Sequence, residues 1–109
     1  MTWALTFLPE AKSDLKDLAG NQRIFVAKAL EKVRQNPLPD YEGGYGKPLG
    51  SKGGKNLTRF LKIKLKSAGL RVVYQLKKTD TEMLIIVIGA RADEEVYEMA
   101  SNRISKYDL

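Results

Sequence analysis

The sequence has 109 residues, of which 43% are hydrophobic and 29% are charged, and its net charge is +6. This length suits a single domain spanning residues 1–109, and the hydrophobic fraction argues against disorder. The chain contains no cysteine and no histidine, which excludes disulfides, thiol catalysis and the commonest ligands of zinc, copper and iron. Any catalysis must use Lys, Arg, Tyr, carboxylates or hydroxyls, and a carboxylate-bound Mg²⁺ stays open.

The sequence also indicates where the chain acts. It has no apolar run near 18 residues, so we expect no transmembrane span. Its first ten residues lack a basic segment followed by a long apolar one, so they do not look like a secretion signal. We therefore expect a cytoplasmic protein, which also fits the lack of cysteine.

The first third of the chain reads as a strand followed by two helices. Alternation over residues 3–8 predicts the strand, and Pro9 suits the first turn of a helix that stops near Gly20. Asn21 is a candidate cap for a second helix, which should end before Pro37. We expect its buried stripe to consist of apolar residues at helical spacing: Ile24, Phe25, Ala27, Leu30 and Val33. Together the two helices predict a helical hairpin.

The rest of the chain reads as a loop, three strands and a helix. Residues 37–56 hold three prolines and six glycines and predict a long loop, without the spacing of a phosphate-binding P-loop. Strands are predicted over residues 60–66, 70–77 and 83–90, joined by tight turns, and a helix over residues 93–107. The predicted fold is therefore α+β: an antiparallel sheet of about four strands, with the helical hairpin on one face and a C-terminal helix.

The charge is distributed unevenly along the chain. Between Gly46 and Lys78 lie ten basic residues and no acidic one, whereas the remainder carries nine basic and thirteen acidic residues. The ten are Lys47, Lys52, Lys55, Arg59, Lys62, Lys64, Lys66, Arg71, Lys77 and Lys78. A segment of one sign attracts polyanions, so we expect this one to hold the phosphate backbone of a nucleic acid.

Five residues are candidates for chemistry on that polyanion. Strand geometry sends Lys62 and Lys64 to one face, and Arg71 just past the turn is expected beside them. Arg91 follows the last strand and suits bidentate binding of a phosphate, while Tyr97 in the closing helix has a hydroxyl for proton transfer or a ring for stacking. A solubilising lysine face, a structural salt bridge and a core tyrosine remain the alternative interpretations of these residues.

The runs KIKLKSAGLRVVYQL and IIVIGARADEEVYEMASNRI, with the opening WALTFLPEAKSDLKDL, resemble the RelE family of bacterial toxin–antitoxin modules. The resemblance covers nearly the whole chain. It implies a RelE-like, microbial-ribonuclease-like fold and a metal-independent, cofactor-free endoribonuclease that cuts mRNA in the ribosomal A site. Carried over by position, it implies a catalytic set: Lys62, Lys64, Arg71, Arg91 and Tyr97.

The resemblance also implies roles and partners. We expect Lys64 or Tyr97 to act as base, and Arg91 to stabilise the phosphate and to be a candidate proton donor. Lys62 and Arg71 are expected to supply electrostatic stabilisation. The seven other basic residues of the segment are expected to contact ribosomal RNA. A RelB-like antitoxin would neutralise the toxin, and operator DNA would be contacted only through the antitoxin complex. Two alternatives stay open: a toxin that binds DNA gyrase, as in the ParE branch, and a nonenzymatic RNA-binding module.

Overall fold

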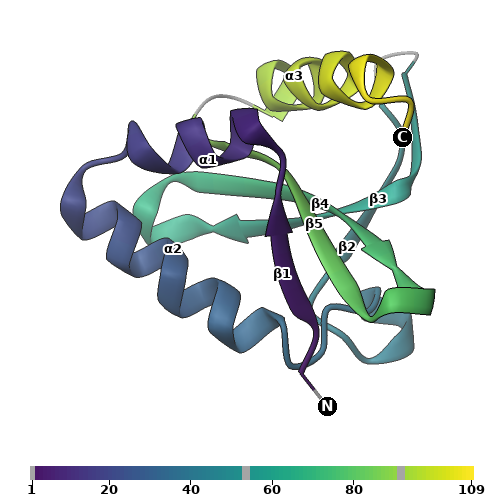
Figure 1. Ribbon diagram of the computed structural model, residues 1–109, viewed down its shortest axis with the longest axis horizontal. Coiled ribbons are helices and arrows are strands. Elements are labelled where there is room, and N and C mark those ends of the chain that lie inside the picture. Colours follow the sequence, from purple (N-terminus) through teal and green to yellow (C-terminus); the bar gives the residue numbers. More distant parts are fainter. Residues whose placement is uncertain (1, 53–54, 91–92) are drawn as a thin grey trace.

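The computed structural model describes residues 2–52, 55–90 and 93–109. These residues form a five-stranded sheet with three α-helices (Figure 1). In chain order the elements are β1 (Ala4–Phe7), α1 (Pro9–Lys16), α2 (Gly20–Val33), β2 (Lys47–Lys52), β3 (Lys55–Leu65), β4 (Leu70–Lys77), β5 (Glu82–Gly89) and α3 (Asp93–Lys106). Short 3₁₀ helices lie at Asp40–Glu42, Lys66–Ala68 and Lys78–Asp80. The predicted α+β class is confirmed.

The sheet has the strand order β1-β5-β4-β3-β2. Strands β3 to β5 pair antiparallel, as predicted, and β2 also pairs antiparallel with β3, whereas β1 lies parallel to β5, with Phe7 opposite Ile85. The prediction of a wholly antiparallel sheet is therefore wrong for β1. Alternation of apolar residues predicts that β1 is a strand and which face of it is buried. It does not reveal the pairing partner or the pairing direction, because the partner strand lies more than 70 residues away in the sequence.

The fifth strand, β2, lies inside the segment that was predicted as a loop. It contains Pro48 and Gly50, and the register with β3 shifts between them, with Gly50 at a φ of +64°. A proline cannot donate a hydrogen bond to a neighbouring strand, so it is tolerated at a sheet edge, where β2 lies. The loop prediction was wrong here because local proline and glycine content does not reveal an edge strand.

Helix α2 buries a different stripe from the one predicted. Val26, Leu30 and Val33 are buried, whereas Ile24 is 60% exposed and Phe25 is 39% exposed. Two overlapping sets of apolar residues in this helix fit a helical spacing of three or four residues, so the spacing alone does not show which set is buried. Packing against the sheet selects the stripe through Val26. The prediction was correct for Leu30 and Val33 and wrong for three residues that are exposed: Ile24, Phe25 and Ala27.

Strands β3, β4 and β5 form the meander that was predicted. Gly69 closes the first turn with a φ of +66°, and β5 is buried along nearly its whole length. Tyr74 of β4 is fully buried, and its hydroxyl donates a 2.8 Å hydrogen bond to the carbonyl of Pro37. Burial raises the pKa of the Tyr74 hydroxyl well above its usual value. The ring of Tyr74, although it lies in the basic segment, thus belongs to the core.

The helices contact the two faces of the sheet differently. Ile63 and Leu65 of β3 line a groove together with Phe25 and Val33 of α2. Gly89 of β5 faces the other way, because a Cβ atom built there would lie 3.3 Å from Val96 of α3. Helix α3 crosses the sheet near the end of β5 (Figure 1). No helix of the described residues is long and apolar enough to span a membrane.

Candidate active site

The basic residues of β3 and β4 form a row on the face of the sheet that α3 approaches. Lys64 pairs directly with Arg71 across the two strands, and Arg71 in turn pairs with Gly89 of β5. Lys62 lies opposite Val73 on one side and Lys47 on the other. The strict alternation of β3 therefore brings Lys62, Lys64 and Arg71 together, as expected. A row of like charges costs up to about 1 kcal/mol per exposed pair, and a bound polyanion offsets that cost.

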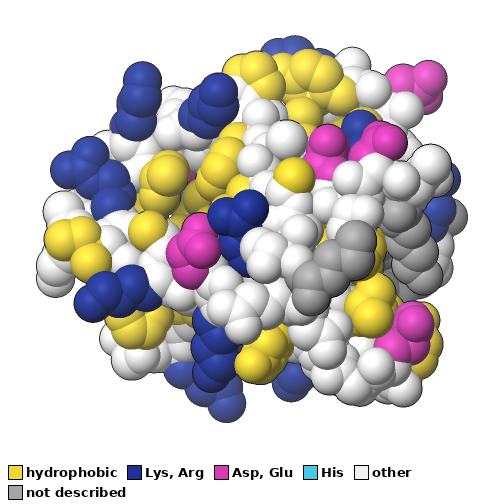
Figure 2. Space-filling model, turned by 60° about the horizontal axis from the view of Figure 1, so that its bottom comes forward, with side chains coloured by type: hydrophobic (Ala, Val, Ile, Leu, Met, Phe, Trp, Pro, Cys, Tyr) yellow, Lys and Arg dark blue, Asp and Glu magenta, His cyan; other side chains and the backbone are white. Residues whose placement is uncertain are grey.

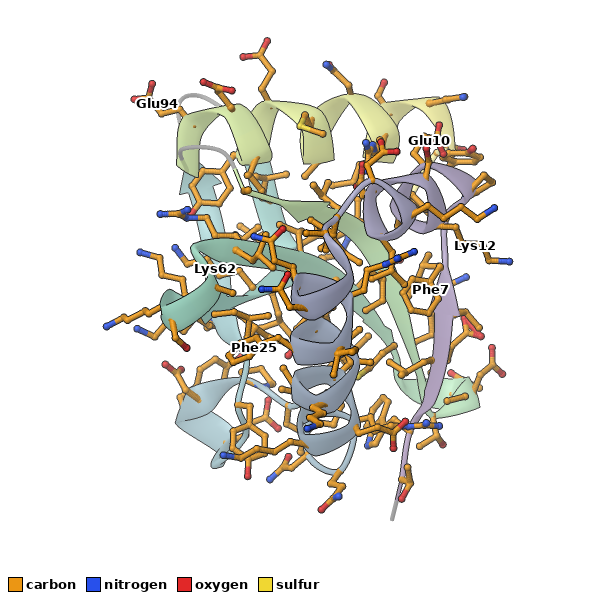
Figure 3. The ribbon with its side chains drawn as sticks, turned by 90° about the vertical axis from the view of Figure 1, so that its left-hand side faces the viewer. Phe7, Glu10, Lys12, Phe25, Lys62 and Glu94 are labelled. Atoms are coloured by element: carbon orange, nitrogen blue, oxygen red, sulfur yellow. The ribbon has the colours of Figure 1, made fainter. Side chains whose placement is uncertain are left out.

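Tyr97 from α3 reaches this row. The ammonium of Lys62 donates a 2.5 Å hydrogen bond to the Tyr97 hydroxyl and lies 5.2 Å from the centre of its ring. Figure 3 shows Lys62 on the sheet below the first turn of α3, where Glu94 is labelled. Tyr97 is only 7% exposed, so its ring is fixed by packing. The sequence identified both residues as candidates but did not predict that they touch.

A close contact between helix and strand makes this approach possible. Val96 packs on Gly89, which has no side chain to hold the helix away. Val96 and Ala100 are completely buried, so this stripe sets how α3 is rotated about its axis. Tyr97 follows Val96 directly and is therefore turned toward β3. The small residue at the end of β5 thus positions an aromatic side chain on the next element.

Arg91 is the candidate that lies outside the described residues. In the sequence it stands two positions after Gly89, and Gly89 is paired with Arg71. The end of β5 that leads to Arg91 therefore lies beside the basic row. Its place in the catalytic set remains a prediction.

The seven predicted RNA contacts are not all brought to one place. Lys47 and Lys66 are exposed near Lys62 and at the β3–β4 turn, respectively. Arg59 donates a 2.5 Å hydrogen bond to the backbone oxygen of Leu109. Lys77 lies 4.0 Å from Glu82 at the far end of β4, about 20 Å along the strand from Arg71. The side chains of Lys52, Lys55 and Lys78 lie outside the described part of the chain.

The helical hairpin carries further exposed positive charge. The count of charges along the sequence did not reveal it, because that count gave the remainder of the chain more acidic than basic residues. Lysine and arginine side chains spread over the left of the face in Figure 2, the side on which α1 and α2 lie in Figure 1. Exposed cations on these helices are Lys12, Lys16, Arg23, Lys28 and Lys32. The carboxylates of Glu10 and Asp14, which count against them in the sequence, are both paired with cations of α3. The positive surface is thus wider than the segment between residues 46 and 78.

A largely buried ion pair was also missed by the sequence analysis. Arg103 of α3 binds both carboxylate oxygens of Asp14 of α1, at 2.6 and 3.2 Å, and each side chain is 14% exposed. A signal for it exists in the sequence, because Asp14 shares the helical spacing of Ala11, Leu15 and Leu18. A carboxylate on the apolar stripe of a helix indicates a partner inside the fold.

The arrangement suits phosphoryl chemistry carried out by cations and a phenol. Because Lys62 donates to the Tyr97 oxygen, the hydroxyl proton of Tyr97 points elsewhere and is available for transfer. The neighbouring cations stabilise negative charge that develops on a phosphate in the transition state. The described residues contain no group of three carboxylates placed to hold a metal ion.

Comparison with known proteins identifies the family. No family model matches the chain. The mRNA interferase toxin RelE of Escherichia coli strain K12 is 30% identical over 104 residues, covering 95% of this chain and 99% of that protein. This chain belongs to the RelE toxin family. The mRNA interferase RelE of Shigella flexneri matches with the same identity and coverage.

Solved RelE structures agree with this assignment. A mutant of E. coli toxin RelE in the free state has a TM-score of 0.74 at 29% identity, covering 95% of this chain and 99% of that one. A mutant of the same toxin bound to an antitoxin RelBc peptide has a TM-score of 0.68 at 28% identity, covering 92% and 95%. The RelBE2 complex of Mycobacterium tuberculosis, at 21% identity and a TM-score of 0.69 over 85% and 95% of the two chains, shows the fold alone.

Proposed function

We propose that this RelE-family chain is the toxin of a toxin–antitoxin module, an endoribonuclease that cleaves mRNA in the A site of the ribosome. The observation that carries the proposal is the contact between Lys62 and Tyr97, which joins a proton-transfer group to the basic row. Residues 1–109 would act as one toxin domain, in the cytoplasm, where the ribosome is found.

In the proposed mechanism the RNA attacks itself. The 2′-hydroxyl would lose its proton to Lys64 or Tyr97, whichever is in its deprotonated form, and attack the adjacent phosphorus, and the bond to the 5′-oxygen of the next nucleotide would break. The products are a 2′,3′-cyclic phosphate and a 5′-hydroxyl, and the proton on that 5′-oxygen would come from Arg91. Lys62, Arg71 and Arg91 would stabilise the added charge of the pentavalent phosphate.

Dependence on the ribosome follows from the type of groups in this site. Tyrosine and lysine ordinarily titrate near pH 10, so unassisted they are poor bases at neutral pH. Holding the RNA in the right geometry contributes several kcal/mol, and the ribosome supplies that positioning. The basic residues of the segment outside the catalytic set would bind ribosomal RNA and not take part in chemistry.

The proposed partner is a RelB-like antitoxin. The E. coli toxin RelE has been solved with an antitoxin RelBc peptide and in an intact RelBE toxin–antitoxin complex. A positive surface of this extent favours an acidic partner segment that folds onto the toxin. Operator DNA would be reached only through the antitoxin.

A translating extract tests the function directly. Purified protein is added to the extract, and mRNA ends are mapped by primer extension. We expect cuts in phase with codons, lost in Tyr97→Phe and Arg91→Ala, and retained in the control Lys16→Met on the exposed side of α1. Intact mRNA with stalled DNA replication in cells would indicate the gyrase-directed alternative instead.

The nonenzymatic RNA-binding alternative finds little support in the aromatic residues of the basic strands. Phe60 and Tyr74 are the aromatics of the basic strands, and they are 2% and 0% exposed. Neither ring is available for a base to stack on, which such modules normally require. Tight RNA binding without mRNA cleavage in the extract would support this alternative over the endoribonuclease.

A further inference from the structure

We propose that the Asp14–Arg103 ion pair is a positioning device that holds Tyr97 against Lys62, and thereby sets the rate of RNA cleavage. The pair joins three elements, because Asp14 belongs to α1, Arg103 to α3, and both bind the backbone of β5. Neither residue lies in the basic row. The inference rests on the proposed function, since it concerns how that site is assembled.

The pair lies beside the part of β5 that extends beyond the end of β1 and therefore has, among the described residues, no neighbouring strand on that side. β1 pairs with β5 only as far as Phe7 opposite Ile85, and then turns into α1. Beyond that point the Ile88 N–H donates to Asp14 at 3.0 Å, and the Ile86 carbonyl accepts from Arg103 at 2.9 Å. The two side chains therefore bind backbone groups that a neighbouring strand would otherwise bind.

A bulge in β5 aims those backbone groups at the helices. Val73 pairs with Val87 and Tyr74 with Ile85, so Ile86 is an extra residue with no partner on β4. An extra residue of this kind rotates the strand locally and redirects its backbone groups. The ion pair thus recognises one particular place on β5, which fixes where α3 lies along the strand.

The link to Tyr97 runs through the orientation of α3. Val96, Ala100 and Arg103 share one helical stripe, and Val96 is packed on Gly89 while Arg103 is tied to Ile86. Two fixed points about 10 Å apart set the rotation and tilt of the helix. The Tyr97 hydroxyl projects from the next position round the helix, so a small rotation at Arg103 would break its 2.5 Å contact with Lys62.

A second pair on the same helix provides a matched control. Lys106 of α3 lies 2.8 Å from Glu10 of α1, and Tyr107 also donates to that carboxylate. The Lys106 side chain is 64% exposed and binds no strand backbone in the described residues. Figure 3 shows Glu10 at the end of α3 remote from Lys62. Breaking this pair should leave Tyr97 in place.

The experiment compares the two pairs in the full chain. Asp14→Asn removes the charge with little change of shape, and the double variant Asp14→Leu with Arg103→Met removes both charges without leaving one buried alone. Cleavage of mRNA on programmed ribosomes is measured at saturation. We expect the maximal rate to fall about 10- to 100-fold in both variants while half-saturation changes less than about twofold. Lys106→Met should cleave like the parent.

A double-mutant cycle separates positioning from general loss of stability. In a Tyr97→Phe background, Asp14→Asn should cause no further loss of the residual rate, because its effect acts through the hydroxyl. A second measurement needs no activity: the ¹³C resonance of the Tyr97 ring should shift in Asp14→Asn and not in Lys106→Met.

Each outcome decides something definite. An unchanged rate in Asp14→Asn, an equal loss with and without the Tyr97 hydroxyl, or an unchanged Tyr97 resonance would overturn the positioning role. Parent protein that leaves mRNA intact would instead overturn the proposed function. In that case the Tyr97 resonance still decides whether the ion pair positions the ring.

Discussion

Lys62 and Tyr97 are 35 residues apart in the chain, yet their side chains meet in a 2.5 Å hydrogen bond. The lysine is partly buried on the face of the sheet that α3 approaches, and the tyrosine comes from the buried side of that helix. Their meeting places a phenol, packed on all but a small part of its surface, at the edge of a row of cations. The chemistry proposed for this protein depends on that contact.

Tyr97→Phe should abolish most of the cleavage without unfolding the protein. The ring and its packing are kept, so we expect the thermal midpoint to change by only a few degrees. Loss of a proton-transfer group should slow cleavage about 10²- to 10⁴-fold. The rate at saturating ribosomes is the measurement, and a rate within about threefold of the parent would exclude Tyr97 from the chemistry.

Gly89→Ala should disturb the site through the helix. The new Cβ would lie 3.3 Å from Val96, so α3 must move outward by a few tenths of an ångström. We expect a loss of about 1–3 kcal/mol in the free energy of unfolding, together with slower cleavage. Gly20→Ala is the control, because its Cβ would meet only the tip of Arg23 at 3.9 Å. If both alanines behave alike in urea melts, the close approach of α3 is not important.

Tyr74→Phe should weaken the fold and spare the activity. It removes the donor to the Pro37 carbonyl, a buried 2.8 Å hydrogen bond, and should cost about 1–3 kcal/mol of unfolding free energy. The raised pKa of Tyr74 adds a pH dependence: its contribution is complete below about pH 10, the unfolded value, and is lost as the pH rises through the folded pKa. Denaturant melts at pH 7 measure the loss of stability, and the cleavage rate shows whether the activity is unchanged.

Glu10 should make the attachment of α3 sensitive to acid. Hydrogen bonds from Lys106 and then Tyr107 lower the pKa of this carboxyl from 4.5 to about 2. A lowered pKa means that the stabilisation is present above pH 4.5 and is lost as the pH falls toward 2. Stability curves of Glu10→Gln and the parent should therefore differ at pH 7 and converge at pH 2. Because the Lys106 partner is exposed, the difference should shrink in high salt, and a full-sized difference that persists at pH 2 would contradict the pairing.

Lys47 and Lys66 should affect binding and not chemistry. Replacing both with glutamine removes two exposed cations beside the proposed site while leaving Lys62 and Tyr97 in contact. We expect weaker binding to ribosomes with a shallower dependence on salt, and a maximal rate within about threefold of the parent. Filter binding over a salt series measures the first effect. A steep fall in the maximal rate would place these lysines in the catalytic step.

The sequence by itself determined the helices, four of the five strands and the candidate residues. Alternation over residues 60–66 separated lysines from core residues, the turn before Arg71 brought a further cation beside them, and the missing histidine and cysteine left tyrosine and lysine for proton transfer. These conclusions need only the periods of strand and helix, which local sequence reveals. The apolar run in β5 likewise marked a central strand before any partner was known.

Only the tertiary structure decided which elements meet and how they face each other. The parallel pairing of β1, the edge strand β2 and the buried stripe of α2 each depend on contacts with distant segments, and local patterns allowed more than one answer. The same holds for the site: Tyr97 reaches Lys62 because Gly89 admits Val96, and because Asp14 and Arg103 bind the bulged part of β5. Residue types therefore indicated the chemistry, whereas long-range packing placed the groups at hydrogen-bonding distance.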